Sequence, residues 1–322
     1  MRAAQISELS GPDAVKVVDV DAPAIGEGQL LIDVHAAGVN FPDLLMTRGE
    51  YQVKPELPFV PGSEVSGIVA DAPAGSGFKV GDRVASFTLL NGIAERVAVP
   101  ADFALRIPDS MTFAQGAALP MNYLTMEFAL IRRGGVQRGE TVLIHGAAGG
   151  IGTAGIQISK ALGATVIAVA STPEKRDVAI AAGADHAIDV EGFLAASKEL
   201  TGGRGVDVVV DPVGGDRFTD SLRALAPEGR VLVIGFTAGD IPTVKVNRLL
   251  LNNVDVRGVG WGAYAFMRPG YISKQWASIT HLLETGAIHP PVGAEYPLSD
   301  VASAIADLGA RRAAGKIVVT LK

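Results

Sequence analysis

Short apolar runs separated by proline and glycine fill roughly the first 120 residues of the chain. VKVVDV, QLLIDVHAAGV, VSGIVA and AERVAVP are examples, and each is bounded by turn-forming residues. Spacing of this kind predicts an antiparallel, β-rich domain with many turns. One stretch differs: NFPDLLMTRG predicts a short helix, with Asn40 placed to cap its start and Gly49 just past its end.

After residue 135 two apolar periods alternate along the chain. Nearly continuous β-branched runs predict buried strands in TVLIH, ATVIAVA, HAID, VDVVVD, RVLVIG and VDVRGVG. The segments between them have helical spacing, and in TPEKRDVAIAAG a helix is expected to begin after Thr172 and to stop at Gly183. The alternation predicts the α/β architecture of a Rossmann domain, a doubly wound parallel sheet that binds dinucleotides.

The last part of the chain returns to the first pattern. YISKQWASITHLLETG predicts an amphipathic helix that ends at Gly286, and a short strand, a helix and the strand KIVVTL follow it. Because the first part is β-rich, we expect KIVVTL to rejoin it. The predicted domains are therefore a β-rich domain from residues 1–120 and 288–322 and a Rossmann domain from residues 121–287.

Composition limits the function classes. The chain has 322 residues, 48% of them hydrophobic and 19% charged, as expected of a soluble, well-packed protein. A net charge of −6 argues against nucleic acid or an anionic membrane surface as the main partner. Because MRAAQISELSG lacks the apolar core of a signal peptide and no apolar stretch is long enough for a membrane span, we expect a cytoplasmic protein.

The chain contains no cysteine, which excludes disulfides, cysteine-ligated zinc and a thiol nucleophile. The histidines also lack the spacing of metal-binding motifs such as HxxxH or HExxH; they are His35, His145, His186, His281 and His289. The sequence therefore predicts no metal site.

The stretch HGAAGGIG follows a predicted strand and opens a predicted helix, which is the context of a dinucleotide-binding fingerprint. Aligned on G-x-G-x-x-G, it places Ala147 first, Gly149 second and Gly152 third. Gly149 would let a diphosphate approach, Gly152 would let the helix pack against the strand, and the amides at Gly150 and Ile151 would face the phosphates. The alternative is a tight strand-to-helix turn without a ligand.

The end of the second strand of this domain bears on the choice of cofactor. An NAD site needs an acidic residue there for the ribose 2′-hydroxyl, but the chain has Ser171, followed by Lys175 and Arg176. Hydroxyl and cationic groups can instead bind a 2′-phosphate. We therefore expect NADPH, the alternative for the two basic residues being a solvated helix face.

These stretches, together with VNFPDLLMTRGEY, LPFVPGSEVSGIV, GADHAIDV, GGRGVDVVVDPVGG and NRLLLNNVDVRGVGWG, resemble the medium-chain dehydrogenase/reductases, specifically their zinc-independent quinone oxidoreductase branch. The resemblance implies a GroES-like β-rich catalytic domain, a Rossmann domain, a cofactor cleft, NADPH and a homodimer. Zinc-dependent relatives have cysteine ligands and a Gly-His-Glu element, whereas this chain has Gly62-Ser63-Glu64. Zinc-assisted alcohol oxidation is therefore not expected.

The same resemblance implies two catalytic candidates, Asn40 and Asp43, and the chemistry of a phenol adds Tyr51. Asn40 matches an asparagine that faces the nicotinamide and the substrate, where an amide can stabilise a developing oxyanion; its alternative role is the helix cap. Asp43 matches the family pattern but is equally explained by local structure. Tyr51 is a proton-donor candidate, as is Tyr264, although packing explains Tyr51 as well and solvent can supply the proton.

Further cofactor contacts are implied on both domains. Thr125 matches a residue that contacts the nicotinamide ribose or amide, with Asn122 or Tyr123 on the same wall. The turn Gly235-Phe236-Thr237 follows the fifth strand and is expected near the nicotinamide. Lys316 matches a residue near the cofactor, its alternative being a surface lysine.

The expected function is an NADPH-dependent quinone reductase. Two alternatives remain open: an enoyl reductase acting on conjugated ketones or acyl-CoA thioesters, and a non-catalytic NADPH-binding protein. An acyl-CoA substrate would need basic residues for its phosphates, and the scattered candidates are Arg132, Arg133, Arg138, Arg248 and Arg268.

Overall fold

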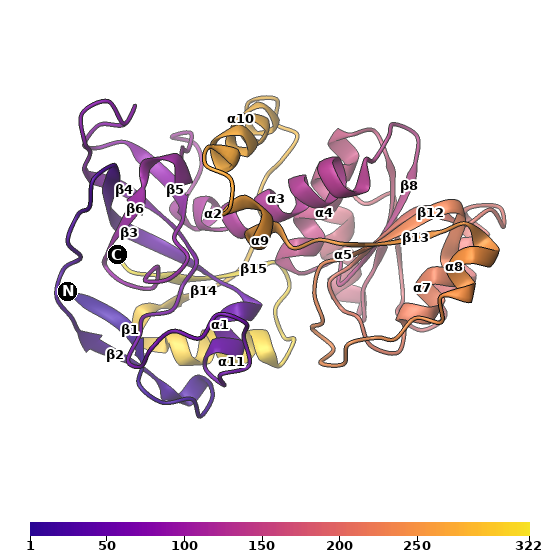
Figure 1. Ribbon diagram of the computed structural model, residues 1–322, viewed down its shortest axis with the longest axis horizontal. Coiled ribbons are helices and arrows are strands. Elements are labelled where there is room, and N and C mark those ends of the chain that lie inside the picture. The colour runs from indigo at the N-terminus through magenta and orange to yellow at the C-terminus, as the bar shows by residue number, and fades with distance from the viewer. The chain divides into compact units, whose positions relative to one another are not determined.

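A computed structural model describes residues 1–322, which form two compact units (Figure 1). The first unit comprises Met1–Met121, Ile272–Trp276 and Pro290–Lys322, and the second comprises Asn122–Tyr271 and Ala277–His289. The sequence placed the changes after residues 120 and 287, and it did not anticipate that residues 272–276 group with the first unit.

The first unit is built on a seven-stranded sheet with the order β14-β15-β3-β4-β5-β7, in which β6 also pairs with β3. All pairs are antiparallel except β14 with β15. The closing strand β15 lies against β3, with Val318 opposite Gly38, so KIVVTL rejoins the β-rich unit as predicted. The strands are β3 (Gln29–Val39), β4 (Glu64–Asp71), β5 (Arg83–Phe87), β6 (Arg96–Pro100), β7 (Ala104–Arg106), β14 (Val292–Pro297) and β15 (Lys316–Thr320).

A two-stranded antiparallel sheet and short helices complete the first unit. Helix α1 packs against α11, and both contribute to the core that covers the long strand β3. This core is aliphatic and includes Leu30, Ile32, Val34 and Leu44. The remaining elements are β1 (Arg2–Ile6), β2 (Val15–Asp19), α1 (Phe41–Met46), α2 (Phe113–Ala117), α11 (Val301–Gly309), and the 3-10 turns η1 (Pro12–Ala14), η2 (Ala101–Phe103) and η4 (Leu298–Asp300).

The second unit contains a six-stranded sheet with the order β10-β9-β8-β11-β12-β13, and every neighbouring pair is parallel. Numbered within the unit, this order is 3-2-1-4-5-6, which is the Rossmann arrangement. All five residues of β8 are buried, as expected of a strand covered on both faces. The strands are β8 (Thr141–His145), β9 (Thr165–Val169), β10 (His186–Ile188), β11 (Val206–Asp211), β12 (Leu225–Val233) and β13 (Asp255–Gly258).

Helices connect these strands. The predicted capping at α5 is observed, because the Thr172 hydroxyl accepts the Lys175 amide at 3.3 Å and Pro173 opens the helix. No helix is both long and apolar enough to cross a bilayer. The helices are α3 (Pro120–Glu127), which continues into the π-helical turn η3 (Phe128–Gly134), α4 (Gly150–Ala161), α5 (Pro173–Ala181), α6 (Phe193–Leu200), α7 (Phe218–Ala224), α8 (Asn247–Asn252), α9 (Trp261–Ala265) and α10 (Tyr271–Glu284). The first two residues of α3 and residues 272–276 of α10 group with the first unit.

Candidate cofactor site and buried polar cluster

Three turns of the second unit meet at the carboxyl edge of its parallel sheet, because neighbouring strands end there in register. Ile144 of β8 lies opposite Val210 of β11. A Cβ atom on Gly146 would lie 3.4 Å from the Val213 side chain, and one on Gly214 would lie 2.9 Å from Phe236. The turns after β8, β11 and β12 are therefore in contact, at the edge where doubly wound folds bind their ligands.

The turn after β8 is left-handed at Gly146, which has a φ of +59°. Ala147 lacks a positive φ and is fully buried, and its amide donates to the Val169 carbonyl oxygen at 3.2 Å. Ala147 therefore ties the turn to the end of β9. The left-handed conformation of this turn falls on Gly146, the residue before Ala147, which explains why alanine is accepted at 147.

Gly149 and Gly152 have different local roles. A Cβ atom on Gly152 would lie 2.5 Å from the backbone of Ala147, so glycine is needed for the close packing of α4 on β8. A Cβ atom on Gly149 would meet only the Gly146 carbonyl oxygen, at 3.5 Å. The space beside Gly149 is therefore open, and the fold itself does not require glycine there.

The first turn of α4 has the features of an anion site. Gly149 is the N-cap residue, so the amides of Gly150 and Ile151 have no carbonyl partner within the helix. Both residues are only partly buried. The Asn122 carboxamide lies against Gly150, where an added Cβ atom would be 2.5 Å from its Nδ2. These backbone donors, the helix dipole and the open face beside Gly149 fit a diphosphate.

The end of β9 carries the residues predicted to choose between cofactors. Ser171 is exposed and Lys175 is half-buried in the first turn of α5. Arg176 is not a simple solvated side chain, since its Nη1 donates to the Asp189 carboxylate at 2.6 Å and to the Ala170 carbonyl oxygen at 3.3 Å. The Glu191 amide, which donates to the Asp189 carboxylate, and this ion pair hold the pKa of Asp189 below its usual value. The ion pair also anchors α5 to the segment after β10.

The turn after β12 contains Gly235, Phe236 and Thr237, all half-buried, and the Thr237 amide donates to the Pro212 carbonyl oxygen at 3.2 Å. Asp211 shapes the neighbouring turn, because its carboxylate accepts the Val213 and Gly214 amides at 2.8 and 2.9 Å. Burial raises the pKa of Asp211. The role of Asp211 in the structure is the sharp turn that brings these loops together.

Of the α3 candidates, Thr125 is 7% exposed and Tyr123 is 1% exposed. The Tyr123 hydroxyl donates to Gln157 Oε1 at 2.7 Å, and Gln157 Nε2 donates to the His289 carbonyl oxygen at 2.8 Å. Tyr123 is therefore a core residue whose phenol has a fixed partner, and burial raises its pKa. Asn122, beside Gly150, is the member of this group that lies at the anion site.

The first unit contains a buried polar cluster formed by Asn40, Glu64 and Lys316, which are 6%, 0% and 4% exposed. Lys316 Nζ forms an ion pair with Glu64 and donates to Asn40 Oδ1 at 2.6 Å. Asn40 Nδ2 in turn donates to Glu64 Oε1 at 2.8 Å. The Met121 amide donates to the other Glu64 oxygen at 2.7 Å, so both carboxylate oxygens have donors.

The cluster excludes the surface alternative for Lys316 and adds a residue, Glu64, that was not predicted. Lys316 is not a surface lysine, because its charge is buried against Glu64. Glu64 was missed as a site residue, although the sequence contained a signal: an acid at the start of a run of apolar strand residues needs a buried partner. Asn40 occupies the N-cap position of α1, while its carboxamide belongs to this cluster.

Asp43 and Tyr51 lie in the same unit. The Asp43 carboxylate is fully buried and accepts the Asn40 amide at 2.7 Å and the Gly62 amide at 3.0 Å, so it fixes the start of α1. Burial raises the pKa of Asp43 to about 6. Tyr51 is half-buried against the aliphatic core, and burial, followed by the charge of Asp43, raises its pKa.

No group of three or more histidine, cysteine, aspartate or glutamate residues in the chain is arranged to hold a metal ion. His145 is fully buried at the end of β8, where Nε2 lies 2.9 Å from the Ser221 hydroxyl and the ring meets Phe193 edge-on. Burial lowers the pKa of His145 to about 3, so its imidazole is neutral near pH 7.

Comparison with known proteins gives matches along the whole chain. Residues 26–109 match the family model for the alcohol dehydrogenase GroES-like domain, and residues 150–279 match the model for zinc-binding dehydrogenases. A quinone oxidoreductase-like protein 2 from Rattus norvegicus is 40% identical, over 100% of this chain and 92% of its own.

Two solved structures are similar over the full length. A probable oxidoreductase from Mycobacterium abscessus has a TM-score of 0.91 and 46% identity, covering 100% of this chain and 99% of its own. A mycobacterial protein solved as its NADPH complex also has a TM-score of 0.91, with 35% identity and complete coverage of both chains.

Proposed function

Because this chain belongs to the zinc-independent quinone oxidoreductase branch of the medium-chain dehydrogenase/reductase family, we propose that it is an NADPH-dependent reductase of quinones or related conjugated carbonyls. The observation that carries the proposal is the turn at Gly146–Ile151, which presents backbone donors and an open glycine at the carboxyl edge of a Rossmann sheet. The NADPH complex of a full-length structural relative supports the choice of cofactor.

The second unit supplies the binding groups. The amides of Gly150 and Ile151 bind the diphosphate, and Gly149 lets it approach. Ser171, Lys175 and Arg176 receive the 2′-phosphate at the end of β9, where no acid follows the strand directly to repel it. Gly235, Phe236 and Thr237 lie three strands from β9, at the end of β12, and contact the nicotinamide half together with Thr125.

When bound, NADPH supplies a hydride, and the chain must orient the acceptor and stabilise the negative charge that develops on it. Asn40 is suited to the second task. One hydrogen of its amide is used at 2.8 Å by Glu64, whereas the other has only long contacts, at 3.3 Å to the Ser63 hydroxyl and 3.4 Å to the Gly38 carbonyl oxygen. That second hydrogen therefore remains available to a stronger acceptor, such as an oxyanion.

Glu64 and Lys316 position Asn40 from opposite ends of its carboxamide. The acceptor Glu64 fixes the nitrogen, and the donor Lys316 fixes the oxygen, so the carboxamide is held in one orientation. The raised pKa of Tyr51 keeps its phenol protonated near pH 7, which is compatible with proton donation. Solvent is an equally sufficient source of the proton in quinone and enone reduction.

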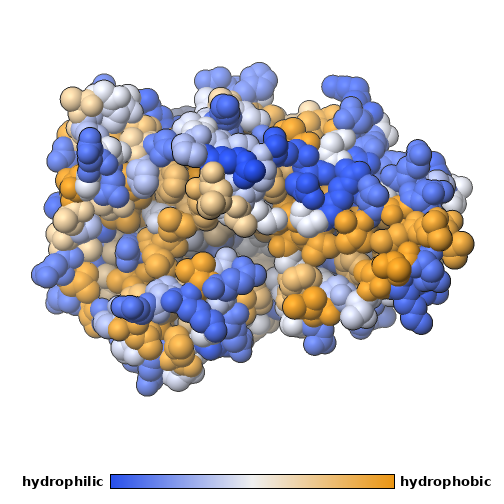
Figure 2. Space-filling view, in the orientation of Figure 1, coloured by the Kyte–Doolittle hydropathy of each residue, from blue (hydrophilic) through white to orange (hydrophobic).

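We also infer that the chain functions as a homodimer. Strand β13 lies at the edge of its sheet, so its outer backbone groups have no neighbouring strand. Next to it in sequence, Val246, Leu250 and Leu251 are 73%, 76% and 74% exposed, and Figure 2 shows a hydrophobic area over α8 and β13 at the right of the view. Sedimentation velocity tests this inference. We expect the wild type to sediment as a dimer and Leu250→Glu as a monomer.

Fluorescence titration with NADPH, followed by turnover assays, tests the proposed function. The assay uses 1,4-benzoquinone, 9,10-phenanthrenequinone and crotonyl-CoA as acceptors, with NADH as the control donor. We expect NADPH to bind more tightly than NADH and at least one conjugated acceptor to be reduced. NADPH binding without oxidation across the panel would instead identify a non-catalytic NADPH-binding protein.

A further inference from the structure

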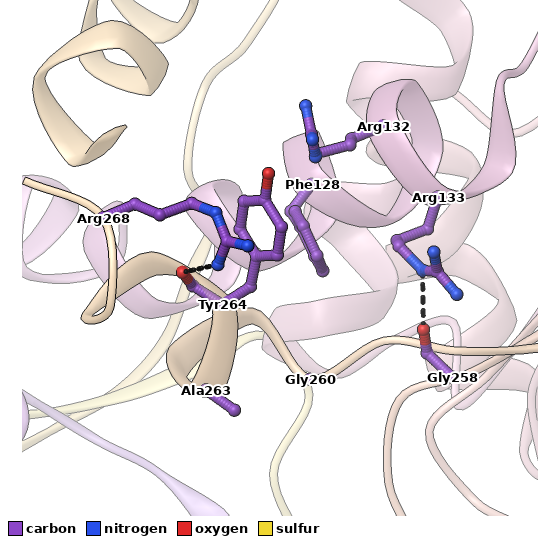
Figure 3. A pocket seen from close by; sticks show the side chains of 8 residues that line it. All are labelled: Phe128, Arg132, Arg133, Gly258, Gly260, Ala263, Tyr264 and Arg268. Carbon is purple, nitrogen blue, oxygen red and sulfur yellow. Dashed lines mark hydrogen bonds between the residues drawn. The ribbon is translucent and has the colours of Figure 1, made fainter. Parts of the chain in front are cut away.

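A pocket of about 670 Å³ opens in the second unit beside the carboxyl end of β13 (Figure 3). One wall comes from η3, and the other comes from the segment that follows β13 and forms α9. The lining residues are Phe128, Arg132, Arg133, Gly258, Gly260, Ala263, Tyr264 and Arg268. Three of the five arginines that looked scattered in the sequence therefore come together here.

The three arginines have no carboxylate partner. The Arg268 guanidinium lies 3.7 Å from the centre of the Tyr264 ring and donates to the Tyr264 carbonyl oxygen at 3.0 Å. Arg132 lies 4.6 Å from the same ring, and Arg133 Nε donates to the Gly258 carbonyl oxygen at 2.9 Å. Stacking and single carbonyl bonds hold these side chains while leaving most of their donors unused.

This arrangement is unusual for the chain, whose net charge is −6. Arg230, for comparison, pairs both terminal nitrogens with the Glu140 carboxylate at 2.7 Å. Three guanidinium groups around one pocket repel each other unless an anion joins them, and one carboxylate would neutralise only one of them. A phosphate monoester carries a charge of about −1.5 to −2 near pH 7 and matches the guanidinium fork.

The aromatic residues add a second requirement. Tyr264 stands between Arg268 and Phe128, with its ring centre 5.1 Å from that of Phe128 (Figure 3). A volume of about 670 Å³ is far larger than a phosphate ion needs and lies in the range of organic ligand sites. The pocket therefore suits a phosphate that is attached to a larger organic group.

The pocket lies near the turn that we assign to the nicotinamide. Strands β12 and β13 are neighbours, and the Val259 amide donates to the Val233 carbonyl oxygen at 2.9 Å. Gly258 and Gly260 therefore leave the sheet at the same edge as Gly235, one strand further along. A molecule held by the arginines lies at the carboxyl edge of this sheet, where the substrate of a Rossmann reductase is reduced.

We propose that this arginine pocket binds the phosphate groups of the substrate, so that the acceptor is a conjugated carbonyl carried on a phosphate-bearing group, such as an acyl thioester of coenzyme A. The proposal rests on the proposed reductase function. It deepens that function by naming the substrate class and by giving Arg132, Arg133 and Arg268 the task of selecting it.

Calorimetric titration of the full chain with coenzyme A tests the pocket without relying on turnover. Saturating NADP⁺ is present throughout, so that the probe cannot occupy the cofactor site. We expect the double variant Arg132→Ala, Arg268→Ala to weaken binding at least tenfold. The matched control is Arg138→Ala, which removes an exposed arginine beside Gly163 and should change binding less than twofold. Arg268→Gln provides a milder variant if the double variant does not fold.

A second readout uses substrate preference. The ratio of kcat/KM for crotonyl-CoA to that for the uncharged enone cyclohexenone should fall at least tenfold in the double variant and stay unchanged in Arg138→Ala. Inorganic pyrophosphate, added as a competitor, distinguishes a site for free phosphates from one that needs the larger group.

Several outcomes would overturn the proposal: equal coenzyme A binding in all variants, an equal loss in the control, or pyrophosphate binding as tightly as coenzyme A. Failure of the reductase function itself would appear separately, as absence of NADPH oxidation with cyclohexenone and with 1,4-benzoquinone in the wild type.

Discussion

The two units present polar groups in opposite ways. In the first unit, Asn40, Glu64 and Lys316 are side chains from distant parts of the chain that are buried and bonded to one another. In the second unit, the turn from Gly146 to Ile151 offers backbone amides that are partly exposed and bonded to nothing in their own helix. The charges of the first arrangement are paired without a ligand, whereas the second arrangement needs a ligand to complete its hydrogen bonds.

This difference separates the effects of mutation. A buried, paired charge depends on its partner, so removing one member of the pair is expected to lower the free energy of unfolding. An open backbone site contributes little to the free energy of unfolding, so blocking it is expected to weaken ligand binding and to leave stability nearly unchanged. Each of the following variants tests one side of this contrast.

The largest effect is expected from Lys316→Met. It leaves the fully buried Glu64 carboxylate without its cation, which should lower the free energy of unfolding by about 3–5 kcal/mol. Urea denaturation measures the change. The double variant Glu64→Gln, Lys316→Met removes both charges and should be less destabilised than Lys316→Met alone. If Lys316→Met is as stable as the wild type, the ion pair does not determine the stability of the first unit.

The next effect concerns Asp43 and pH. Its pKa is about 6 in the folded protein and 3.8 in the reference state, so the folded protein holds this proton more tightly than the unfolded chain. The contribution of Asp43 to stability is therefore complete below pH 4 and is lost as pH rises through 6. The loss is about 3 kcal/mol at most.

Asp43→Asn should remove this dependence. Denaturation of the wild type and the variant at several pH values between 4 and 7 gives the difference, in which titrations common to both proteins cancel. A difference in unfolding free energy that does not change across this range would show that Asp43 ionises as it does in the unfolded chain.

Smaller effects distinguish the two glycines of the cofactor turn. Gly152→Ala places a Cβ atom 2.5 Å from the Ala147 backbone and should destabilise the fold by about 1–3 kcal/mol. Gly149→Ala has no close neighbour within the chain, so thermal unfolding should shift little, while NADPH affinity should fall about tenfold or more. Equal effects of both substitutions on stability would mean that Gly149 is also a packing residue.

The smallest predicted effect is the choice between cofactors. Lys175→Ala combined with Arg176→Ala should weaken NADPH binding about tenfold and leave NADH binding within about twofold, because only NADPH has the 2′-phosphate. Arg176 also pairs with Asp189, so Asp189→Asn serves as the control for loss of that ion pair. A similar loss of affinity for both cofactors would assign these residues to the packing of α5.

The sequence predicted the second unit better than the first for a physical reason. Its strands, its Thr172 cap and its glycine turn follow from residues close together in the chain, where periodicity and spacing express the structure directly. Alanine fits the first position of the aligned turn because its φ is not positive and the left-handed residue is the preceding Gly146. That detail depends on how the turn meets Val169.

The first unit's cluster could not be predicted from local patterns. Lys316 and Asn40 are 276 positions apart, and only the pairing of β15 with β3 brings them together. Glu64 follows the same rule, because its partners come from other elements. In the second unit, the arginine pocket was missed for a similar reason: Arg132 and Arg268 meet only through Tyr264.

The central claim is that the turn of the second unit binds NADPH and that Asn40 of the first unit acts on the substrate. Measuring NADPH affinity and kcat for 9,10-phenanthrenequinone in Asn40→Ala and Gly149→Ala tests it directly. Asn40→Ala should lower kcat by about 10²-fold, with the NADPH Kd within about threefold of the wild type. Gly149→Ala should raise the NADPH Kd at least tenfold, with kcat at saturating NADPH nearly unchanged. If Asn40→Ala changes only the NADPH Kd, or leaves kcat unaltered, the claim is contradicted.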